Sequence, residues 1–173
     1  MNVFFSNNVQ MPPVMRYGSG RGKVELDEVD RKLISALQED GRLSMRALAD
    51  LVGVALGTVS NRLGKLEENG VITGYTANLN PDKIGWEMTV VVGLQIVKGE
   101  LLEVQELIAS DPRVFAVYDV TGEMDSLVFA RVTDRDDLDD FTKTVLSTDG
   151  VSRSTTHVVL NTVKEISVTL PPK

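Results

Sequence analysis

The stretch LADLVGVALGTVSNRLGKLEENGVITGY, residues 48–75, decides the fold of the first half of the chain. Its apolar residues recur at helical spacing, which predicts a helix from about Ala55 to Glu68 with Val59, Leu63 and Leu66 on its buried side. The glycine at position 53 allows a tight turn before this helix, and an Asn-Gly pair ends it because both residues tolerate left-handed dihedral angles. The stretch therefore predicts the second helix of a helical pair.

Two further helices are expected before this one. Apolar residues at helical spacing from Leu26 to Leu37 predict the first helix, and Gly41 ends it. Ser44 then supplies a side-chain cap for the second helix, because a serine hydroxyl accepts a hydrogen bond from the first helical N–H groups. Three short helices with a glycine turn before the third predict a helix-turn-helix domain.

The residues after the third helix suggest a wing and then a linker. VITGYTANL, residues 71–79, alternates around a central glycine and predicts a short hairpin. Asn80-Pro81 and Gly85 are typical of a linker, so we place a domain boundary near residue 81. The expected organisation is a disordered leader over residues 1–24, a winged helix-turn-helix domain over 25–81 and a second domain over 82–173.

The second half of the chain has a different periodicity. Two successive strand-helix-strand units share similar breaks, SDPRV and STDGV, which is typical of an internal repeat. The α+β order predicts a ferredoxin-like βαββαβ sheet with both helices on one face. The opposite face would then need a partner chain to cover its apolar residues. The expected strands are residues 86–97, 114–120, 126–132 and 154–160, and the expected helices are 101–109 and 137–146.

The charge of the chain is acidic overall but basic in one place. The net charge is -7, and residues 81–173 alone contain 9 basic and 16 acidic residues. Residues 41–66 instead contain four cations, Arg42, Arg46, Arg62 and Lys65, against Asp50 alone. Salt screens charges beyond about 8–10 Å, so this local patch decides whether DNA is attracted. An ordinary mixed surface is the alternative interpretation.

Several functional classes are excluded or disfavoured by composition. The chain has no cysteine and one histidine, His157, so we expect no thiolate metal site, no disulfide scaffold and no metal cofactor. The absence of an apolar run of about 20 residues predicts no membrane partner, and we expect the chain to act in the cytoplasm. His157 is interpreted as a packed or surface residue rather than a pH switch. The segment Arg16–Lys23 is either a plain leader or a basic arm that reaches DNA.

The third predicted helix is the candidate for reading DNA. In a helix-turn-helix the second helix of the pair enters the major groove, and its outer face would here combine small, polar and basic residues. An asparagine can pair with an adenine edge, and serine can meet either base type. A three-helix packing module with solvated polar residues is the alternative. The predicted DNA-binding residues are Arg42, Ser44, Leu56, Gly57, Thr58, Ser60, Asn61, Arg62 and Lys65, of which Arg42, Ser44, Arg62 and Lys65 would contact phosphate.

Four cations per chain are few for DNA binding, because the salt dependence of affinity scales with the number of neutralised phosphates. Two or more copies on one duplex would compensate by avidity. The sparse patch and the bare sheet face thus both predict a homo-oligomer.

From about Leu26 to Leu170 the chain resembles the Lrp/AsnC (feast/famine) transcription regulators. The resemblance is carried by LDEVDRKLISALQEDGRLS, LADLVG, TVSNRLGKLEENGVITGY, LNPDKIG, VTGEMD and VSRSTTHVVLNTVK. It implies a DNA-binding regulator of α+β architecture whose second domain binds an amino acid or similar effector, with dimers that assemble into tetramers or octamers. One departure is Ala55, where the family usually has a serine or threonine that opens the recognition helix.

The resemblance also implies where an effector binds. The family's Gly-x-x-Asp turn is matched by Gly122 and Asp125, with Glu123 and Met124 between them. Ser154 and Thr156 match the family's hydroxyl positions in a neighbouring strand. A well-formed hairpin without a ligand, and a solvent-facing strand edge, are the alternatives for the turn and the two hydroxyls.

Two other functions remain as alternatives. An architectural DNA-binding protein would use the same helices with little sequence choice, since two polar base-reading side chains specify few positions. A sirohaem-decarboxylase-like enzyme shares the two-domain layout, but we expect that chemistry to need more histidines and a basic pocket. We therefore expect no enzymatic activity.

Overall fold

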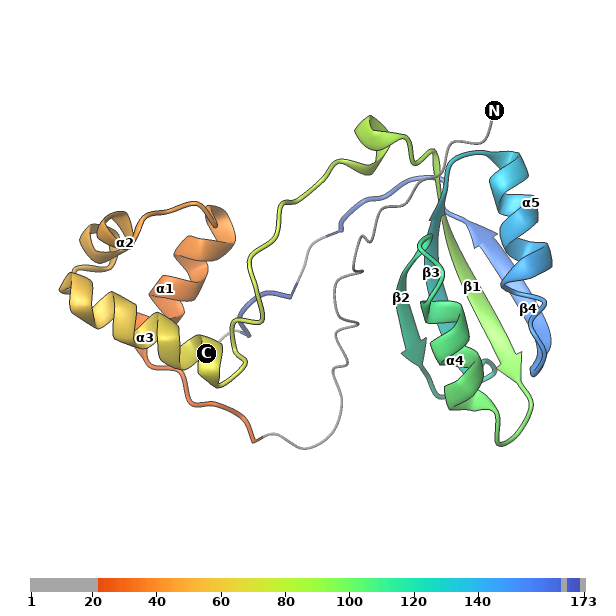
Figure 1. Ribbon diagram of the computed structural model, residues 1–173, viewed down its shortest axis with the longest axis horizontal. Coiled ribbons are helices and arrows are strands. Elements are labelled where there is room, and N and C mark those ends of the chain that lie inside the picture. The colour runs from red at the N-terminus through yellow and green to blue at the C-terminus, as the bar shows by residue number, and fades with distance from the viewer. Residues whose placement is uncertain (1–21, 166–167, 172–173) are drawn as a thin grey trace, which may run out of the picture. The chain divides into compact units, whose positions relative to one another are not determined.

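The structure is a computed structural model that describes residues 22–165 and 168–171. The chain divides into two compact units (Figure 1). The three-helix unit comprises Met1–Tyr75 together with Thr169–Lys173, and the sheet unit comprises Thr76–Val168. The change of unit thus comes a few residues before the boundary expected near residue 81, and the last residues of the chain return to the first unit. The expected leader lies almost wholly outside the described residues.

The three helices of the first unit are α1 (Glu28–Glu39), α2 (Met45–Val52) and α3 (Leu56–Glu68). Two of the three helices begin at a side chain that accepts a hydrogen bond from a free N–H group of the first turn. Asp27 and Asp30 form a capping box at α1, and the Ser44 hydroxyl accepts from Ala47 N–H at α2. Ala55 precedes α3 and gives no side-chain cap, as its methyl group requires. Gly53 ends α2 at φ 77°, in the left-handed region that the expected turn needs.

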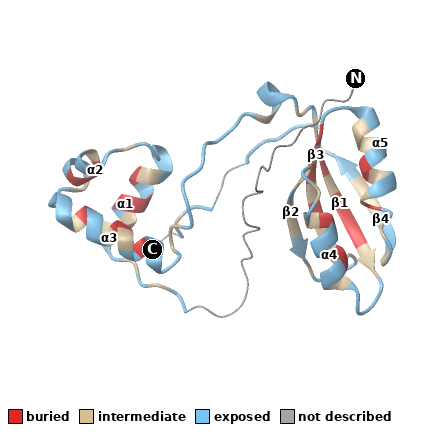
Figure 2. Cartoon of the chain, viewed as in Figure 1, coloured by how far each residue is buried: buried red, intermediate tan, exposed pale blue. Residues whose placement is uncertain are grey.

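The core of this unit lies between the three helices, as the buried residues in Figure 2 show. Replacing one fully buried leucine by alanine in such a core costs about 2–5 kcal/mol. Since the unit has few such residues, one substitution removes much of its stability. The buried residues are Leu33, Ile34, Ala36, Leu48, Ala49, Val59, Leu63 and Leu66.

The hairpin expected over residues 71–79 is not formed. No residue of this segment is in a strand, and Val71 and Ile72 instead pack their side chains against the helical core. The N–H groups of both residues donate to Leu66 O near the end of α3. These two bonds hold the segment against the helices. The alternation that predicted a wing therefore reflects two core contacts, followed by exposed residues.

The sheet unit follows a short 3-10 helix, η1 (Pro81–Ile84), and has the expected βαββαβ order. The four antiparallel strands lie in the order β2-β3-β1-β4, which is the ferredoxin-like arrangement. The elements are β1 (Met88–Ile96), α4 (Leu101–Ala109), β2 (Val114–Asp119), β3 (Ser126–Val132), α5 (Arg135–Thr144) and β4 (Val151–Val158).

One face of the sheet packs under α4 and α5. Burial alternates strictly along β3, so every second residue from Ser126 to Val132 lies in the core. Val90, Val92 and Leu94 of β1 join them, and Phe141 of α5 is fully buried against the same cluster. The expected placement of both helices on one face is thus correct.

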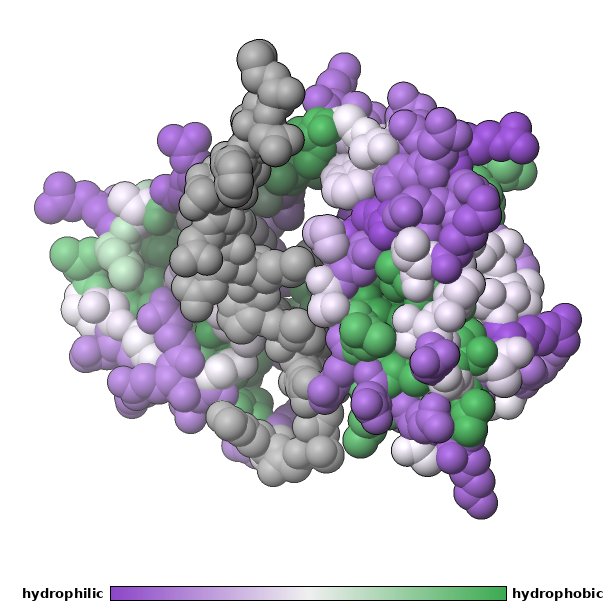
Figure 3. Space-filling model, turned by 45° about the vertical axis from the view of Figure 1, so that its right-hand side comes forward, coloured by the Kyte–Doolittle hydropathy of each residue, from purple (hydrophilic) through white to green (hydrophobic). Residues whose placement is uncertain are grey.

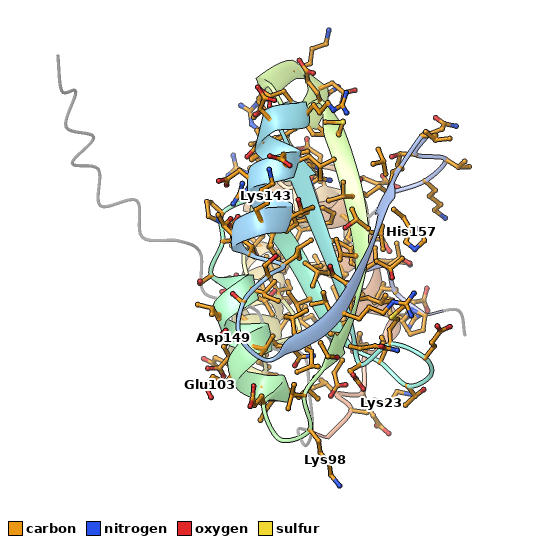
Figure 4. The ribbon with its side chains drawn as sticks, turned by 90° about the vertical axis from the view of Figure 1, so that its right-hand side faces the viewer. Lys23, Lys98, Glu103, Lys143, Asp149 and His157 are labelled. Carbon is orange, nitrogen blue, oxygen red and sulfur yellow. The ribbon has the colours of Figure 1, made fainter. Side chains whose placement is uncertain are left out.

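The opposite face of the sheet carries aromatic side chains that stay partly exposed. The Phe129 ring lies 5.6 Å from that of Tyr118 and 6.2 Å from that of Phe115. The Arg131 guanidinium lies 4.1 Å above the Phe115 ring. His157 extends from β4 on the side away from α4 and α5 (Figure 4), opposite Val91 of β1. We call this surface the open sheet face.

Figure 3 shows hydrophobic side chains exposed among hydrophilic ones on the surface of the sheet unit. Phe115 and Tyr118 are 45% and 56% exposed, which is high for large apolar rings. Among the described residues, no helix is long and apolar enough to cross a membrane.

Candidate functional site

The outward side of α3 is made of small and polar residues. Its apolar positions Val59, Leu63 and Leu66 are buried, which fixes the opposite side of the helix toward solvent. By its spacing, that outward side bears Asn61 and Lys65 together with two glycines, Gly57 and Gly64. A side-chain carbon added at either glycine would meet no atom of the described chain within 4 Å. Of the other predicted contacts, Leu56 and Ser60 are exposed and Thr58 is half-buried.

Two glycines inside a helix are costly when nothing in the domain requires them. Each destabilises a helix by roughly 0.5–1 kcal/mol relative to alanine. Because a side-chain carbon at Gly57 or Gly64 would meet no described atom within 4 Å, a lack of space within the unit does not account for these glycines. A bare helix surface instead allows another molecule to approach the backbone closely.

Arg62 forms ion pairs within the three-helix unit, and the phosphate contact expected for it stays a prediction. Its Nη1 atom lies 2.6 Å from Asp27 Oδ2 and 2.8 Å from Asp30 Oδ1. The side chain is only 30% exposed. The two carboxylates raise the pKa of Arg62, and the Asp30 N–H together with Arg62 lowers the pKa of Asp27. Arg62 therefore joins the middle of α3 to the start of α1.

A groove of about 460 Å³ runs beside α3 and gathers several predicted residues. It is bordered by residues 24–27 on one side and by the α3 side chains Thr58, Asn61 and Lys65 on the other. Arg62 and its two aspartates lie in the same groove. The structure thus brings Thr58, Asn61, Arg62 and Lys65 together along this groove.

The start of α2 presents the other predicted phosphate contacts. Arg42 and Ser44 are both exposed, and so is Arg46 in the first turn of the helix. The Ser44 oxygen accepts from Ala47 N–H at 3.1 Å, so its hydroxyl hydrogen stays available to donate to an anion. Helix N-termini attract phosphate through their free N–H groups and positive dipole end.

The turn between β2 and β3 is held by the backbone of β1. Gly122 has φ 130°, where a side chain would be strained, as the Gly-x-x-Asp interpretation requires. Asp125 N–H donates to Leu94 O, and Asp125 Oδ2 accepts from Ile96 N–H, both at 2.8 Å. The Asp125 carboxylate therefore accepts a backbone N–H of β1 rather than one from within the turn.

The two residues in the middle of the turn also contact β1. Glu123 O accepts from Gln95 Nε2 at 3.1 Å. Met124 lies over Gly93, where an added side-chain carbon would come within 2.9 Å of Met124 Cγ. Because Gly93 lies opposite Leu127 on the open sheet face, the Met124 side chain covers that face.

Ser154 and Thr156 lie across β1 from the turn. Ser154 pairs with Leu94 and Thr156 with Val92. Leu94 thus pairs with Ser154 on one side and accepts from Asp125 N–H on the other, whereas Thr156 lies opposite the middle of β1. Because paired residues of antiparallel strands share a face, Ser154 and Thr156 lie on the face of the sheet that packs under the helices, opposite Met124. Ser154 is exposed and Thr156 half-buried.

In the sheet unit, three aspartates surround one arginine and join two elements. Arg113 lies among Asp111, Asp137 and Asp140 with N–O distances of 2.8 Å to each, and it lies 5.0 Å from the centre of the Phe141 ring. The Arg113 side chain, 13% exposed, lowers the pKa of Asp111 by hydrogen bonding and joins α5 to the start of β2. No group of three metal-ligating residues arises in the described segments.

Models of two protein families match the chain. Winged helix-turn-helix DNA-binding matches residues 26–73, and Lrp/AsnC ligand binding domain matches residues 89–168. An uncharacterized HTH-type transcriptional regulator of Pyrococcus furiosus is 47% identical over 82% of this chain and 96% of its own length. The chain belongs to the Lrp/AsnC family of transcriptional regulators.

Other members of the Lrp/AsnC family agree in sequence and structure. The regulator FL11 of Pyrococcus horikoshii is 35% identical over 83% of this chain and 95% of its own length. A transcriptional regulator of Neisseria meningitidis, solved as an L-Met complex, has a TM-score of 0.79 at 30% identity, covering 85% and 97% of the two chains. AsnC of E. coli has the same TM-score at 21% identity over 84% and 99%, which speaks for the fold alone.

The sequence did not indicate the residues that hold the turn at 122–125 and the Arg62 side chain in place. Gln95 and Ile96 donate hydrogen bonds to the turn at residues 122–125, yet in sequence they are ordinary strand residues far from it. Asp27 and Asp30 are acidic residues typical of a helix start, and that pattern does not indicate that they also bind Arg62. A prior model of the α1–α3 packing would have been needed to find that pair.

Proposed function

We propose that this Lrp/AsnC regulator recognises a specific duplex sequence with the outward side of α3, and that an amino acid bound near residues 122–125 modulates this binding. The observation that carries the proposal is the outward side of α3, where Asn61 and Lys65 lie beside two glycines whose missing side chains leave open space. Arg42, Ser44 and Arg46 at α2 add phosphate contacts beside it. Arg62 acts by holding α3 in place.

The amino-acid effector is supported by the chemistry of the turn. Asp125 uses Oδ2 for Ile96 N–H, and its carboxylate has a second oxygen that can accept from a ligand ammonium group. Exposed Ser154 provides a hydroxyl at the same end of β1. The Neisseria regulator of the same fold was solved with L-Met, so L-methionine is the first ligand to test.

A homodimer through the open sheet face completes the proposal. Phe115 and Tyr118 are too exposed for a surface that stays in water. Arg131 Nε is buried and has no hydrogen-bond partner within the described part of the chain, although the side chain is only 19% exposed. A second copy across this face would cover the rings, and doubling the sparse DNA patch would raise affinity by avidity. Tetramers or octamers would then form from such dimers.

The experiment that tests the proposed function is sequencing of the DNA fragments that co-purify with the full-length protein, with and without L-methionine. A recovered sequence is then competed against bulk DNA at one salt concentration. Preference for the recovered sequence by about 10³-fold or more supports a sequence-specific regulator. A ratio near one supports the architectural alternative instead.

The enzymatic alternative is disfavoured by the relatives of the chain, which are transcriptional regulators. Ultraviolet-visible titration of the protein with a haem precursor tests it directly. A stoichiometric spectral change would revive the sirohaem-decarboxylase-like interpretation, and an unchanged spectrum would remove it.

A further inference from the structure

The first helical residue of α3 is a large apolar side chain that stays exposed. Leu56 is 49% exposed. Val52 and Val54, just before it in the chain, pack against the three-helix core, whereas Leu56 is not among the described residues that do so. Packing within the unit therefore gives no reason for a leucine at this position.

The residue before Leu56 also presents apolar surface where a polar side chain is usual. Ala55 is the N-cap of α3, a position at which serine, threonine, aspartate or asparagine would accept a hydrogen bond from a first-turn N–H group. Its backbone is extended as an N-cap requires, but its methyl group makes no capping bond. Ala55 and Leu56 are both exposed at the start of α3 (Figure 2). This helix thus begins with an apolar surface, whereas α1 and α2 each begin with a capping side chain.

The place of Leu56 in the helix pair puts it at the edges of bases. In a helix-turn-helix the first helix of the pair crosses the DNA backbone, and the N-terminal residues of the second helix contact base edges in the major groove. Leu56 is the first residue of that second helix, α3. Ser60, one turn further on, is exposed on the same side. An apolar side chain therefore lies where a regulator of this class reads the duplex.

The major groove offers a leucine one apolar partner among the four bases. Guanine, cytosine and adenine present hydrogen-bond donors and acceptors there, whereas thymine also presents its C5 methyl group. A leucine that covers a donor or acceptor without replacing its hydrogen bond to water incurs a desolvation cost. A leucine that covers a methyl group instead removes apolar surface from water on both molecules. The chemistry of Leu56 therefore favours thymine.

We propose that Leu56 reads thymine through its C5 methyl group, and that Ala55 extends the apolar contact surface. The inference rests on the proposed function and deepens it, because it names one base that α3 selects. Asn61, which lies five residues further along α3, suits an adenine edge. Leu56 and Asn61 thus both favour A·T pairs, and the sites that this regulator prefers have A·T pairs beneath the start of α3.

The test compares duplexes that differ only in the methyl group. The full-length protein is titrated by fluorescence anisotropy, at one salt concentration, with a short alternating A·T duplex and with the same duplex carrying uracil in place of thymine. Wild type should bind the thymine duplex roughly fourfold more tightly for each α3 that is engaged, which is the effect of burying one methyl group. Equal affinity for the two duplexes would overturn the proposal.

Substitutions at position 56 assign the effect to one side chain. Leu56→Ala should bring the ratio of the two affinities close to one, whereas Leu56→Met keeps the apolar surface and should retain the ratio. Leu51→Ala is the matched control, because it truncates an exposed leucine of α2 in the same unit. Both alanine variants should keep the wild-type thermal midpoint, since neither leucine belongs to the core described above. A retained ratio in Leu56→Ala, or an equal loss in Leu51→Ala, would overturn the assignment.

A second pair of duplexes separates the methyl group from the shape of A·T sequences. 5-Methylcytosine places a C5 methyl group in the major groove of a G·C pair. Wild type should therefore prefer a methylated alternating G·C duplex to the unmethylated one by a similar factor, and Leu56→Ala should not. A preference confined to the thymine and uracil pair would assign the effect to duplex shape and overturn the proposal.

The same titrations distinguish a failure of this inference from a failure of the proposed function. A protein that binds the thymine and uracil duplexes with equal affinity remains a DNA-binding protein and loses only the thymine contact. A protein that binds none of these duplexes, even in dilute salt, would contradict the proposed function and the thymine contact together.

Discussion

Arg62, in the middle of the recognition helix, forms an ion pair with Asp30 in the first turn of α1, with Arg62 Nη1 2.8 Å from Asp30 Oδ1. Asp27 completes the arrangement at 2.6 Å. A cation in this helix would ordinarily be assigned to a phosphate contact. Here its partners lie within the domain, so Arg62 joins α3 to the start of α1.

The first prediction separates positioning from phosphate contact. Lys65→Ala should reduce the slope of log affinity against log salt by about 0.9, because one phosphate contact is lost. Arg62→Ala should weaken binding and lower the denaturation midpoint while leaving that slope unchanged. Fluorescence anisotropy over a salt series and thermal unfolding measure both. A slope change in Arg62→Ala as large as that in Lys65→Ala would return Arg62 to the phosphate.

The second prediction concerns the glycines of α3. Gly64→Ala should stabilise the helix by roughly 0.5–1 kcal/mol, because no described atom lies near the added methyl group. The same methyl group should weaken duplex binding by roughly tenfold, equivalent to about 1.4 kcal/mol of lost contact. Ser35→Ala, on an exposed position of α1, is the control and should leave binding unchanged. Tighter or equal binding by Gly64→Ala would show that DNA does not approach this side.

The third prediction follows from the lowered pKa of Asp27. Its ordinary value is 3.8, and the Asp30 N–H and Arg62 lower it in the folded state. The stabilisation is therefore complete above about pH 4 and is lost as the pH falls through the lower folded pKa. Asp27→Asn should be less stable than wild type at neutral pH, and the difference should shrink on acidification. Urea unfolding between about pH 6 and 2 measures it, and a constant difference would be the contrary result.

The fourth prediction tests a close approach between α4 and the start of β4. Gly150 has φ 90°, and a side-chain carbon there would lie 2.7 Å from Val104 Cγ2. Gly99 has a similar φ of 99° but open space around it. Gly150→Ala should therefore lose about 1–3 kcal/mol more stability than Gly99→Ala, since both suffer backbone strain and only one overpacks. If denaturant unfolding shows equal losses of stability in the two variants, backbone strain alone explains the loss and overpacking against Val104 contributes nothing.

The fifth prediction addresses the charge of the effector turn. Asp125→Asn keeps an oxygen for Ile96 N–H and removes the negative charge, whereas Asp125→Ala removes both. L-methionine binding should be lost in both variants, and unfolding should shift appreciably only in Asp125→Ala. Calorimetry and gel filtration give the two readouts, with dimers intact throughout. Unaltered binding by Asp125→Asn would remove the proposed ammonium contact.

Local sequence signals predicted much of this fold because they act over short distances. Ser44 and Gly53 mark the ends of α2 through their own hydrogen bonding and dihedral freedom, and both were placed correctly. Alternation along Ser126–Val132 likewise predicted a strand with one buried face. These features need no knowledge of the rest of the chain.

Features that depend on residues distant in sequence could not be predicted in this way. The ion pairs of Arg62 are one case, because its two carboxylate partners lie 32 and 35 residues away. The phosphate contact of Arg62 stays a prediction. The wing expected over residues 71–79 was wrong because the sequence of this segment does not show that Val71 and Ile72 pack on the helical core. The DNA-facing and effector-facing residues stay predictions from pattern and family, supported by their exposure and placement.

The central claim is that an acidic chain binds DNA by multiplying a small basic helix surface through self-association. Sedimentation velocity of the full-length protein with a fluorescent duplex, taken from the co-purified fragments, tests it in dilute salt. The account predicts a protein of twice the chain mass or a multiple of it, sedimenting together with the duplex. A strictly monomeric protein, or a duplex that sediments as free DNA, would contradict it.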